Sequence, residues 1–239
     1  SPSRIEPTRL EDVPEAISDV VAELSAASAK LAHSLNPRTA SNLADLVRII
    51  NTYYSNLIEG HDTRPHDIER ALAGKFAGDK ERRNLQIEAA AHVRVQAEVD
   101  RLYIDGTLPE PASTNFILWL HREFYRDAPK EMLRIRGANR EFTMTPGAWR
   151  SLPKHDVAVG RHQPPSSDRV ADFMTYFAER YRFDRLGKAA RIIAIPAAHH
   201  RFTYIHPFPD GNGRVARLMS HAMAHEAGIV AHGLWSVSS

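Results

Sequence analysis

The chain has 239 residues, of which 43% are hydrophobic and 25% charged, with no cysteine and a net charge of +2. This composition is typical of a folded globular protein of one or two domains, and it excludes collagen-like, disordered and disulfide-stapled classes. No apolar run approaches the roughly 20 residues needed to cross a bilayer. Residues 1–14 lack the basic and apolar regions of a secretory signal. We therefore expect a cytoplasmic protein without a membrane span, whose metal chemistry rests on histidine and carboxylate.

Charge is distributed unevenly along the chain. Residues 1–110 carry 13 basic and 18 acidic side chains, whereas residues 111–239 carry 18 basic and 11 acidic ones. This asymmetry favours an anionic ligand in the second half, or attraction between the two halves. Two ordinary solvated surfaces explain it equally well.

Apolar residues recur at helical spacing along most of the chain. The first two predicted helices pass through Ile17–Leu31 and Leu43–Leu57, and the pair Glu59-Gly60 ends the second. Between 133 and 165 the pattern changes: residues 140–145 alternate and Pro146-Gly147 is typical of a turn, which predicts a short hairpin and a loop. The expected fold class is mostly α, a helical bundle with a small β-hairpin. Further helices are predicted at 66–76, 80–104, 113–127, 167–182, 186–204 and 213–227.

Residues 206–217 interrupt the helical pattern with the segment His-Pro-Phe-Pro-Asp-Gly-Asn-Gly-Arg-Val-Ala-Arg. Gly211 and Gly213 permit backbone conformations in which successive N–H groups point at one anion, and the following helix adds the positive end of its dipole. Arg214 and Arg217, three residues apart, project from one face of that helix and can bind phosphates. The P-loop and G-x-G-x-x-G patterns are absent, so the common nucleotide folds are not indicated.

Two further groups in the segment carry chemistry. Asp210 is its only carboxylate, and a lone carboxylate beside a phosphate site is a usual Mg²⁺ ligand. His206 can accept a proton near neutral pH. Taken separately, these residues would be a turn, a helix cap and a structural histidine, and an EF-hand fragment fits worse because Arg214 would take a liganding position. Their conjunction favours a phosphate-binding catalytic loop.

This segment resembles the signature H-x-F-x-[D/E]-G-N-G-R-x-x-R of the Fic family at all eight specified positions. Ser55-Asn56-Leu57-Ile58-Glu59-Gly60 is similar to the [S/T]-x-x-x-E-[G/N] motif of the Fic class with an N-terminal inhibitory helix. The resemblance extends from about residue 40 to 227 and includes a flap-like hairpin beginning Gly137-Ala138-Asn139-Arg140. It implies a Fic fold, with an N-terminal helical region at 1–106 that contains the inhibitory helix (about 40–60) and a Fic core at 107–239.

The resemblance also implies an activity. The protein would be a self-inhibited adenylyltransferase that moves AMP from ATP to a Ser, Thr or Tyr hydroxyl of a protein, itself included, and releases pyrophosphate. His206 would deprotonate the hydroxyl and Asp210 would hold Mg²⁺. The remaining roles implied are stabilisation of the α-phosphate by Asn212 with the backbone of Gly211 and Gly213, and orientation of the β- and γ-phosphates by Arg214 and Arg217.

Glu59 also attracts attention on physical grounds. A carboxylate at the C-terminal end of a helix faces the negative end of the dipole, which costs about 0.3–1 kcal/mol, so an arginine partner is expected. In the family this partner is the second arginine of the motif, here Arg217, and the pair displaces the γ-phosphate of ATP. The alternative is a solvent-exposed Glu59. By the same resemblance, this glutamate could instead position a water that removes AMP from a modified protein.

Other interpretations remain open from the sequence. The loop could serve transfer of a different nucleotide or phosphate-containing group, or a non-catalytic nucleotide-binding module. The flap at 137–145 would offer an edge strand to a target peptide. His221 and His225, at i and i+4, suggest zinc, but we reject a zinc site because H-E-x-x-H is not matched and no third ligand is evident. Nucleic acid is not expected as a partner of this segment, whereas a homo-oligomer is left open.

Overall fold

The computed structural model describes residues 1–5, 12–137 and 140–236, and within these ranges the fold is mostly helical with one two-stranded hairpin. The predicted fold class is confirmed. No helix among the described residues is long and apolar enough to cross a membrane. The helices are α1 (Glu15–Ser34), α2 (Pro37–Ile58), α3 (Pro65–Leu72), α4 (Lys80–Ile104), α5 (Thr114–Phe124), α6 (Val170–Arg180), α7 (Lys188–Ile205) and α8 (Asn212–Glu226).

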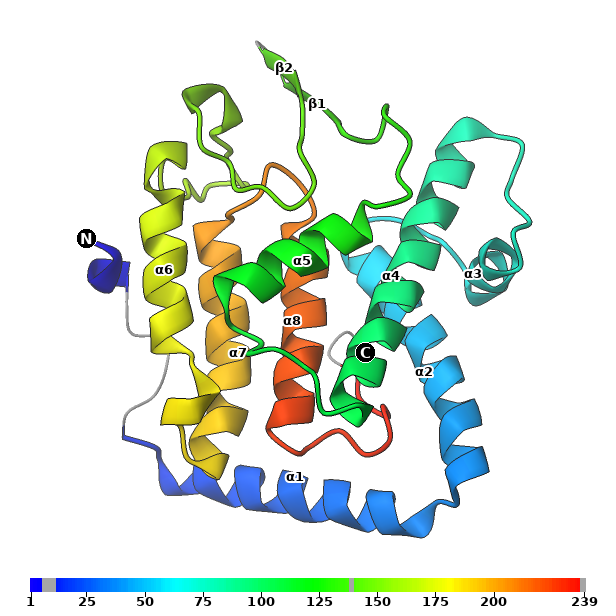
Figure 1. Cartoon of the computed structure of the whole chain (residues 1–239), viewed down its shortest axis with the longest axis vertical. Coiled ribbons are helices and arrows are strands. Elements are labelled where there is room, and N and C mark those ends of the chain that lie inside the picture. The colour runs from blue at the N-terminus through cyan, green and yellow to red at the C-terminus, as the bar shows by residue number, and fades with distance from the viewer. Residues whose placement is uncertain (6–11, 138–139, 237–239) are drawn as a thin grey trace.

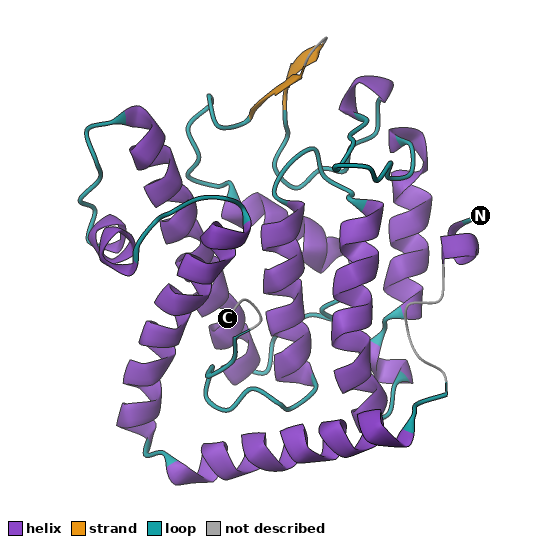
Figure 2. Cartoon of the chain, turned by 180° about the vertical axis from the view of Figure 1, so that it is seen from behind, coloured by secondary structure: helices purple, strands orange, loops and turns teal. Residues whose placement is uncertain are grey.

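The helices α7 and α8 form the centre of the molecule, where they pack side by side (Figures 1 and 2). α4 and α5 pack against α8, α6 packs against α7, and α1 crosses the lower end of the central pair. Consecutive residues of α7, Ile192 to Ala194, are all buried, as expected for a helix surrounded by others. The core also takes in Val21 of α1 and Val95 of α4, so it crosses the predicted domain boundary at 106, which itself stays a prediction.

The small β-hairpin projects from the end of the molecule at which α7 turns into α8. Strand β1 (Arg134–Gly137) pairs antiparallel with β2 (Arg140–Thr143), and the register places Gly137 opposite Arg140. The predicted flap residues Ala138 and Asn139 lie outside the described residues. The turn predicted at Pro146-Gly147 is present after β2, and Gly147 adopts φ 76° there.

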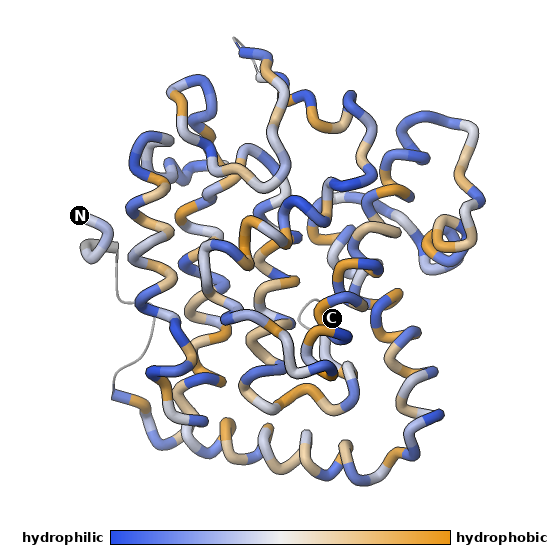
Figure 3. The backbone as a smooth tube through the Cα atoms, viewed as in Figure 1, coloured by the Kyte–Doolittle hydropathy of each residue, from blue (hydrophilic) through white to orange (hydrophobic). Residues whose placement is uncertain are grey.

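The helix α2 differs from the other long helices in the face it buries. Its N-terminus is capped by Asn36, whose side chain accepts the N–H of Thr39 at 2.9 Å. The apolar stripe predicted from the sequence is partly solvent-exposed, and hydrophobic segments recur along α1 and α2 at the edge of the molecule (Figure 3). The side chains on the buried face are instead small or polar. This face consists of Ala40, Ala44, Asn51, Thr52, Ser55 and Asn56, while Leu43, Leu46, Tyr54, Leu57 and Ile58 are exposed.

Candidate active site

The segment predicted to carry the chemistry forms the connection between α7 and α8. His206 ends α7 in the left-handed region with φ 51°, and Gly211 adopts φ 78° immediately before α8. A Cβ at Gly211 would lie 2.8 Å from the Tyr125 hydroxyl, so both the conformation and the close approach require glycine. The two left-handed residues bend the chain so that α8 starts at Asn212.

The beginning of α8 is the part of the loop that is suited to bind an anion. The first N–H groups of a helix have no intrahelical acceptor, and the dipole adds positive potential at the same place. Asn212 makes two bonds to the backbone of Phe208: its Oδ1 accepts the N–H at 2.9 Å and its Nδ2 donates to the carbonyl at 2.8 Å. The buried Asn212 side chain therefore shapes the loop, and its backbone N–H is the group that remains for an anion.

His206 is half-buried at the end of α7. Burial lowers the pKa of its imidazole, an effect opposed by a hydrogen bond with the backbone of Thr203. The ring is therefore mainly neutral at pH 7, as a group that accepts a proton must be.

Asp210 is held at two points by α5. The hydroxyl of Tyr125 donates to Asp210 Oδ2 at 2.8 Å, and His121 Nε2 lies 3.2 Å from the Asp210 carbonyl. Because His121 Nδ1 accepts the Gly147 N–H at 2.8 Å, and burial lowers the His121 pKa to about 4, the ring is neutral and Nε2 carries the proton. Burial alone would raise the pKa of Asp210, but Arg214 and Tyr125 lower it. A partly exposed, ionised carboxylate results, 43% accessible.

Arg217 is paired with the end of α2. Its Nη2 donates to Glu59 Oε1 at 2.6 Å and its Nε donates to Ser55 Oγ at 2.7 Å. The predicted Glu59–Arg217 contact is therefore present. The carboxylate also covers the start of α8, since a Cβ at Gly213 would overlap Glu59 Oε1. Glu59 thus occupies part of the surface that an anion would contact.

Arg214 is paired with a second carboxylate that the sequence did not point to. Its Nη1 donates to Glu88 of α4, and its Nη2 lies 3.7 Å from Asp210 Oδ2. The guanidinium also lies over the ring of Phe124, with 5.2 Å to the centroid. Only 5% of its side chain is exposed. Both motif arginines are consequently neutralised by carboxylates from the N-terminal helices.

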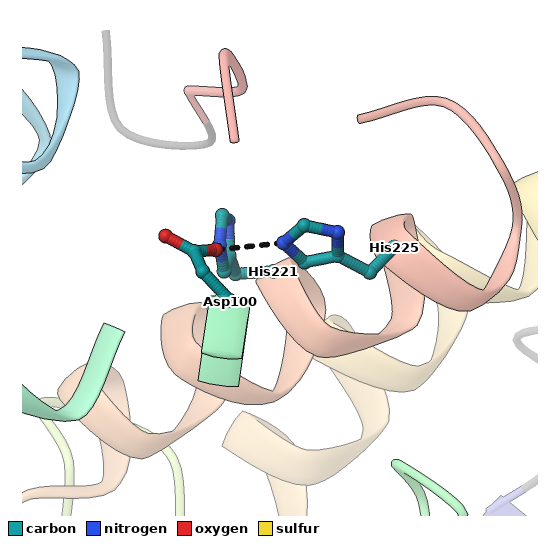
Figure 4. Close-up of side chains that lie close together, drawn as sticks. All are labelled: Asp100, His221 and His225. Carbon is teal, nitrogen blue, oxygen red and sulfur yellow. Dashed lines mark hydrogen bonds and ion pairs between the residues drawn. The ribbon is translucent and has the colours of Figure 1, made fainter. Parts of the chain in front are cut away.

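Asp100, His221 and His225 form a separate buried cluster further along α8, toward its C-terminal end (Figure 4). Our expectation that no third ligand accompanies the two histidines is wrong, because α4 brings Asp100 between them. His221 Nε2 and His225 Nε2 lie 2.6 and 2.7 Å from the same oxygen, Asp100 Oδ1, and Arg48 Nε donates to Oδ2 at 2.7 Å. These hydrogen bonds hold the pKa of Asp100 well below its usual range despite burial. The cluster is a hydrogen-bonded network that ties α2 to α4 and α8.

A cavity of about 660 Å³ adjoins Arg217, between α1, α2, α7 and α8. Its volume lies in the range of about 300–1,000 Å³ that is usual for small-molecule sites. The lining is mainly apolar, with Leu24, Ile58 and Ile195, and it includes the polar side chains Thr203 and Ser220.

Sequence reasoning missed several residues that support the loop. Tyr125 and Glu88 contact residues 85 and 126 positions away, and neither belongs to a recognisable local pattern. Ser55 was predicted only as part of the inhibitory motif, and its contact with Arg217 adds a second bond to that arginine. Contacts of this length depend on how helices pack, which a single sequence does not display.

Comparison with known proteins agrees with the motif. Residues 111–224 match the model of the Fic/DOC family. Protein adenylyltransferase Fic of Drosophila virilis is 32% identical over 75 residues, which are 31% of this chain and 16% of that protein; the Drosophila erecta protein matches at the same identity. The match therefore spans about a sixth of these relatives.

Solved structures show the same fold. A Fic domain containing signaling protein from Bacteroides thetaiotaomicron has a TM-score of 0.64 and 23% identity, covering 86% of this chain and 72% of that one. Fic-1 from C. elegans (residues 134–508, E274G) has a TM-score of 0.64 and 17% identity, covering 89% and 59%. The motif at 206–217 lies inside the part of the chain, residues 111–224, that matches the Fic/DOC family model.

Proposed function

We propose that the protein is an adenylyltransferase that moves AMP from ATP to a Ser, Thr or Tyr hydroxyl of a protein and releases pyrophosphate. The observation that carries the proposal is the convergence, on one loop, of a neutral His206, an ionised Asp210 and an anion-binding helix start. The resemblance to protein adenylyltransferases over 75 residues supports it.

The residues divide the chemistry as follows. His206 accepts the proton of the attacking hydroxyl while its oxygen forms a bond to the α-phosphorus. The bond between that phosphorus and the α,β-bridging oxygen breaks, and pyrophosphate leaves with its electron pair. The N–H groups of residues 211–213 stabilise the charge on the α-phosphate, and Arg214 and Arg217 orient the β- and γ-phosphates.

The residues present fit a magnesium ion. Asp210 is ionised and partly exposed beside the helix start, and Tyr125 fixes one of its oxygens. Carboxylate oxygens are the ligands that Mg²⁺ prefers. When bound, the ion would neutralise charge on the α- and β-phosphates.

We also propose that Glu59 restrains this activity. Its carboxylate accepts a hydrogen bond from Arg217 at 2.6 Å and covers Gly213. The carboxylate would therefore repel the γ-phosphate of ATP and compete with it for Arg217. ATP would bind with its α-phosphate out of line for attack. The hairpin β1–β2 would present an edge strand to the target protein.

A second candidate activity uses the same carboxylate. Because Glu59 lies over the start of α8, it could orient a water toward the phosphorus of an AMP-modified side chain and release AMP. Transfer of another nucleotide or phosphate-containing group would use His206 in the same way.

The test is transfer of α-labelled AMP from ATP with Mg²⁺, comparing wild type, Glu59→Gly, and Glu59→Gly combined with His206→Ala. We expect labelling of the protein or a target only in the single variant. UTP, GTP and CDP-choline run in parallel separate the nucleotide classes. Loss of label from a premodified target in wild type would favour AMP removal, and silence of Glu59→Gly with every donor would contradict the inhibition model.

A further inference from the structure

Arg150 lies in the segment between β2 and α6, and its side chain is buried against the loop at 206–212. Its Nε donates to the His206 carbonyl at 2.7 Å and its Nη2 donates to the Ile205 carbonyl at 3.1 Å. Its backbone N–H donates to the Pro207 carbonyl at 3.0 Å. One residue therefore binds three consecutive carbonyls centred on His206.

The guanidinium is anchored on its other side as well. Nη1 donates to Ser167 Oγ at 3.1 Å and lies 3.6 Å from Asp156 Oδ1, while Nη2 also donates to the Pro165 carbonyl. Because the guanidinium is planar and its donors have fixed directions, these contacts leave it one orientation. The loop before α6 and the end of α7 are thus held at a constant separation.

The end of α7 needs such a partner. The last four carbonyls of an α-helix have no intrahelical donor, and the carbonyl of Ile205 belongs to this set. His206 then adopts the left-handed region, which residues with a Cβ rarely enter. A cation at a helix C-terminus also interacts favourably with the dipole. Arg150 supplies both the donors and the charge.

We infer that Arg150 is a positioning residue for the reaction: it holds in one conformation the backbone from which the His206 imidazole projects. This inference rests on the proposed role of His206 as the proton acceptor. Whether the environment of the His206 ring depends on Arg150 can be measured without any transfer reaction.

The charges around His206 predict the direction in which its pKa changes when Arg150 is replaced. Burial lowers the His206 pKa, and the positive charge of Arg150 lowers it further. The Thr203 backbone hydrogen bond and the Asp210 carboxylate act in the opposite direction. Replacing Arg150 by a neutral residue of similar length therefore moves the His206 pKa upward.

The first experiment is an NMR titration of the His206 ring in wild type, Arg150→Met and Arg150→Lys, with Arg161→Met as control. Arg161 lies in the same segment and is exposed. We expect a rise of about half a pH unit or more in Arg150→Met, with a smaller rise in Arg150→Lys. An unchanged His206 pKa in folded Arg150→Met would overturn the inference.

The second experiment measures transfer in the Glu59→Gly background. Arg150→Met is expected to lower kcat at least about tenfold while KM for ATP stays within about threefold, because base geometry is lost and phosphate contacts remain. Ser167→Ala, which removes a single anchor of the guanidinium, is expected to lower kcat less and guards against a folding defect in Arg150→Met. Added methylguanidinium should restore part of the kcat of Arg150→Ala.

The two experiments distinguish failure of the proposed function from failure of the positioning role of Arg150. If Glu59→Gly shows no His206-dependent transfer, the proposed function fails, and the titration still reports whether the environment of the His206 ring depends on Arg150. If transfer occurs and both Arg150→Met and Ser167→Ala, made in the Glu59→Gly background, keep the kcat of Glu59→Gly, the positioning role fails while the proposed function stands.

Discussion

The two arginines of the motif are neutralised in different ways. Arg217 binds Glu59, which follows the last turn of α2 and keeps 30% of its side chain exposed. Arg214 binds Glu88, which lies within α4 and keeps 14% exposed, beside a cation that is almost fully buried. The same pairing therefore occurs once at a partly exposed helix end and once inside the packed body of the protein.

The helices that carry these carboxylates explain the difference. α2 buries alanines and small polar side chains, and its attachments are polar: Arg48 to Asp100, Asn51 to the Trp235 carbonyl, and Ser55 to Arg217. Replacing such a polar contact by hydrogen bonds to water costs little, about 0.5–1.5 kcal/mol each. α4 instead contributes Val95 and Val99 to the core. We therefore expect the Glu59 pair to respond to ligands and the Glu88 pair to serve stability.

The largest expected effect is on stability. Glu88→Ala leaves the buried Arg214 without its main partner and should lower the free energy of unfolding by about 3 kcal/mol. Glu59→Ala should lower it by less than about 1 kcal/mol, because that pair is partly exposed and screened. Urea unfolding of the two variants checks this, with Glu69→Ala on α3 as an exposed control. Equal losses at both positions would remove the distinction between the pairs.

The next effect is on nucleotide affinity. Glu59→Gln keeps the shape of the side chain but removes the charge that competes with a phosphate, so ATP should bind about tenfold more tightly. Glu88→Gln should change the dissociation constant by less than about threefold, since Arg214 stays in place. Calorimetric titration with a non-hydrolysable ATP analogue measures both. A larger gain in ATP affinity in Glu88→Gln than in Glu59→Gln would mean that Glu88, and not Glu59, is the carboxylate that competes with the phosphate.

A smaller effect is expected on the mobility of α2. Arg48→Met removes the bond to Asp100 Oδ2 and should weaken the attachment of α2 by about 1 kcal/mol. Amide hydrogen exchange in α2 should then quicken roughly fivefold relative to wild type, with little change in α7. Arg38→Met, at an exposed position of the same helix, is the control. Unchanged amide exchange in α2 would show that the Arg48–Asp100 contact does not control the local opening of this helix.

The smallest effect concerns Asp210, the carboxylate beside Arg214. The folded-state pKa of Asp210 is lowered, so it contributes stability above its unfolded pKa of about 3.9 and loses it as the pH falls through the folded value. Tyr125→Phe removes one cause of the lowering. We expect a loss of about 0.5–1 kcal/mol at pH 7 that shrinks toward pH 3, measured by thermal unfolding across pH. A loss independent of pH would assign Tyr125 to packing alone.

The sequence alone determined the helical elements and the catalytic loop. Helical periodicity located the helices because a 3.6-residue repeat is a local property, and the loop was recognisable because its special residues are contiguous. The Glu59 contact was anticipated from helix electrostatics together with the family motif. The face that α2 buries was not, since Leu43, Leu46 and Leu57 of its apolar stripe are exposed.

Only the tertiary structure decided which groups surround the loop. Glu88, Tyr125 and Arg150 reach it from three separate segments, and Asp100 joins His221 and His225 although α4 and α8 are far apart in the chain. Ionisation follows from these placements, because burial and neighbouring charges set the pKa of each group. Local pattern thus identifies the residues to which we assign the chemistry, whereas packing determines their charge, orientation and accessibility.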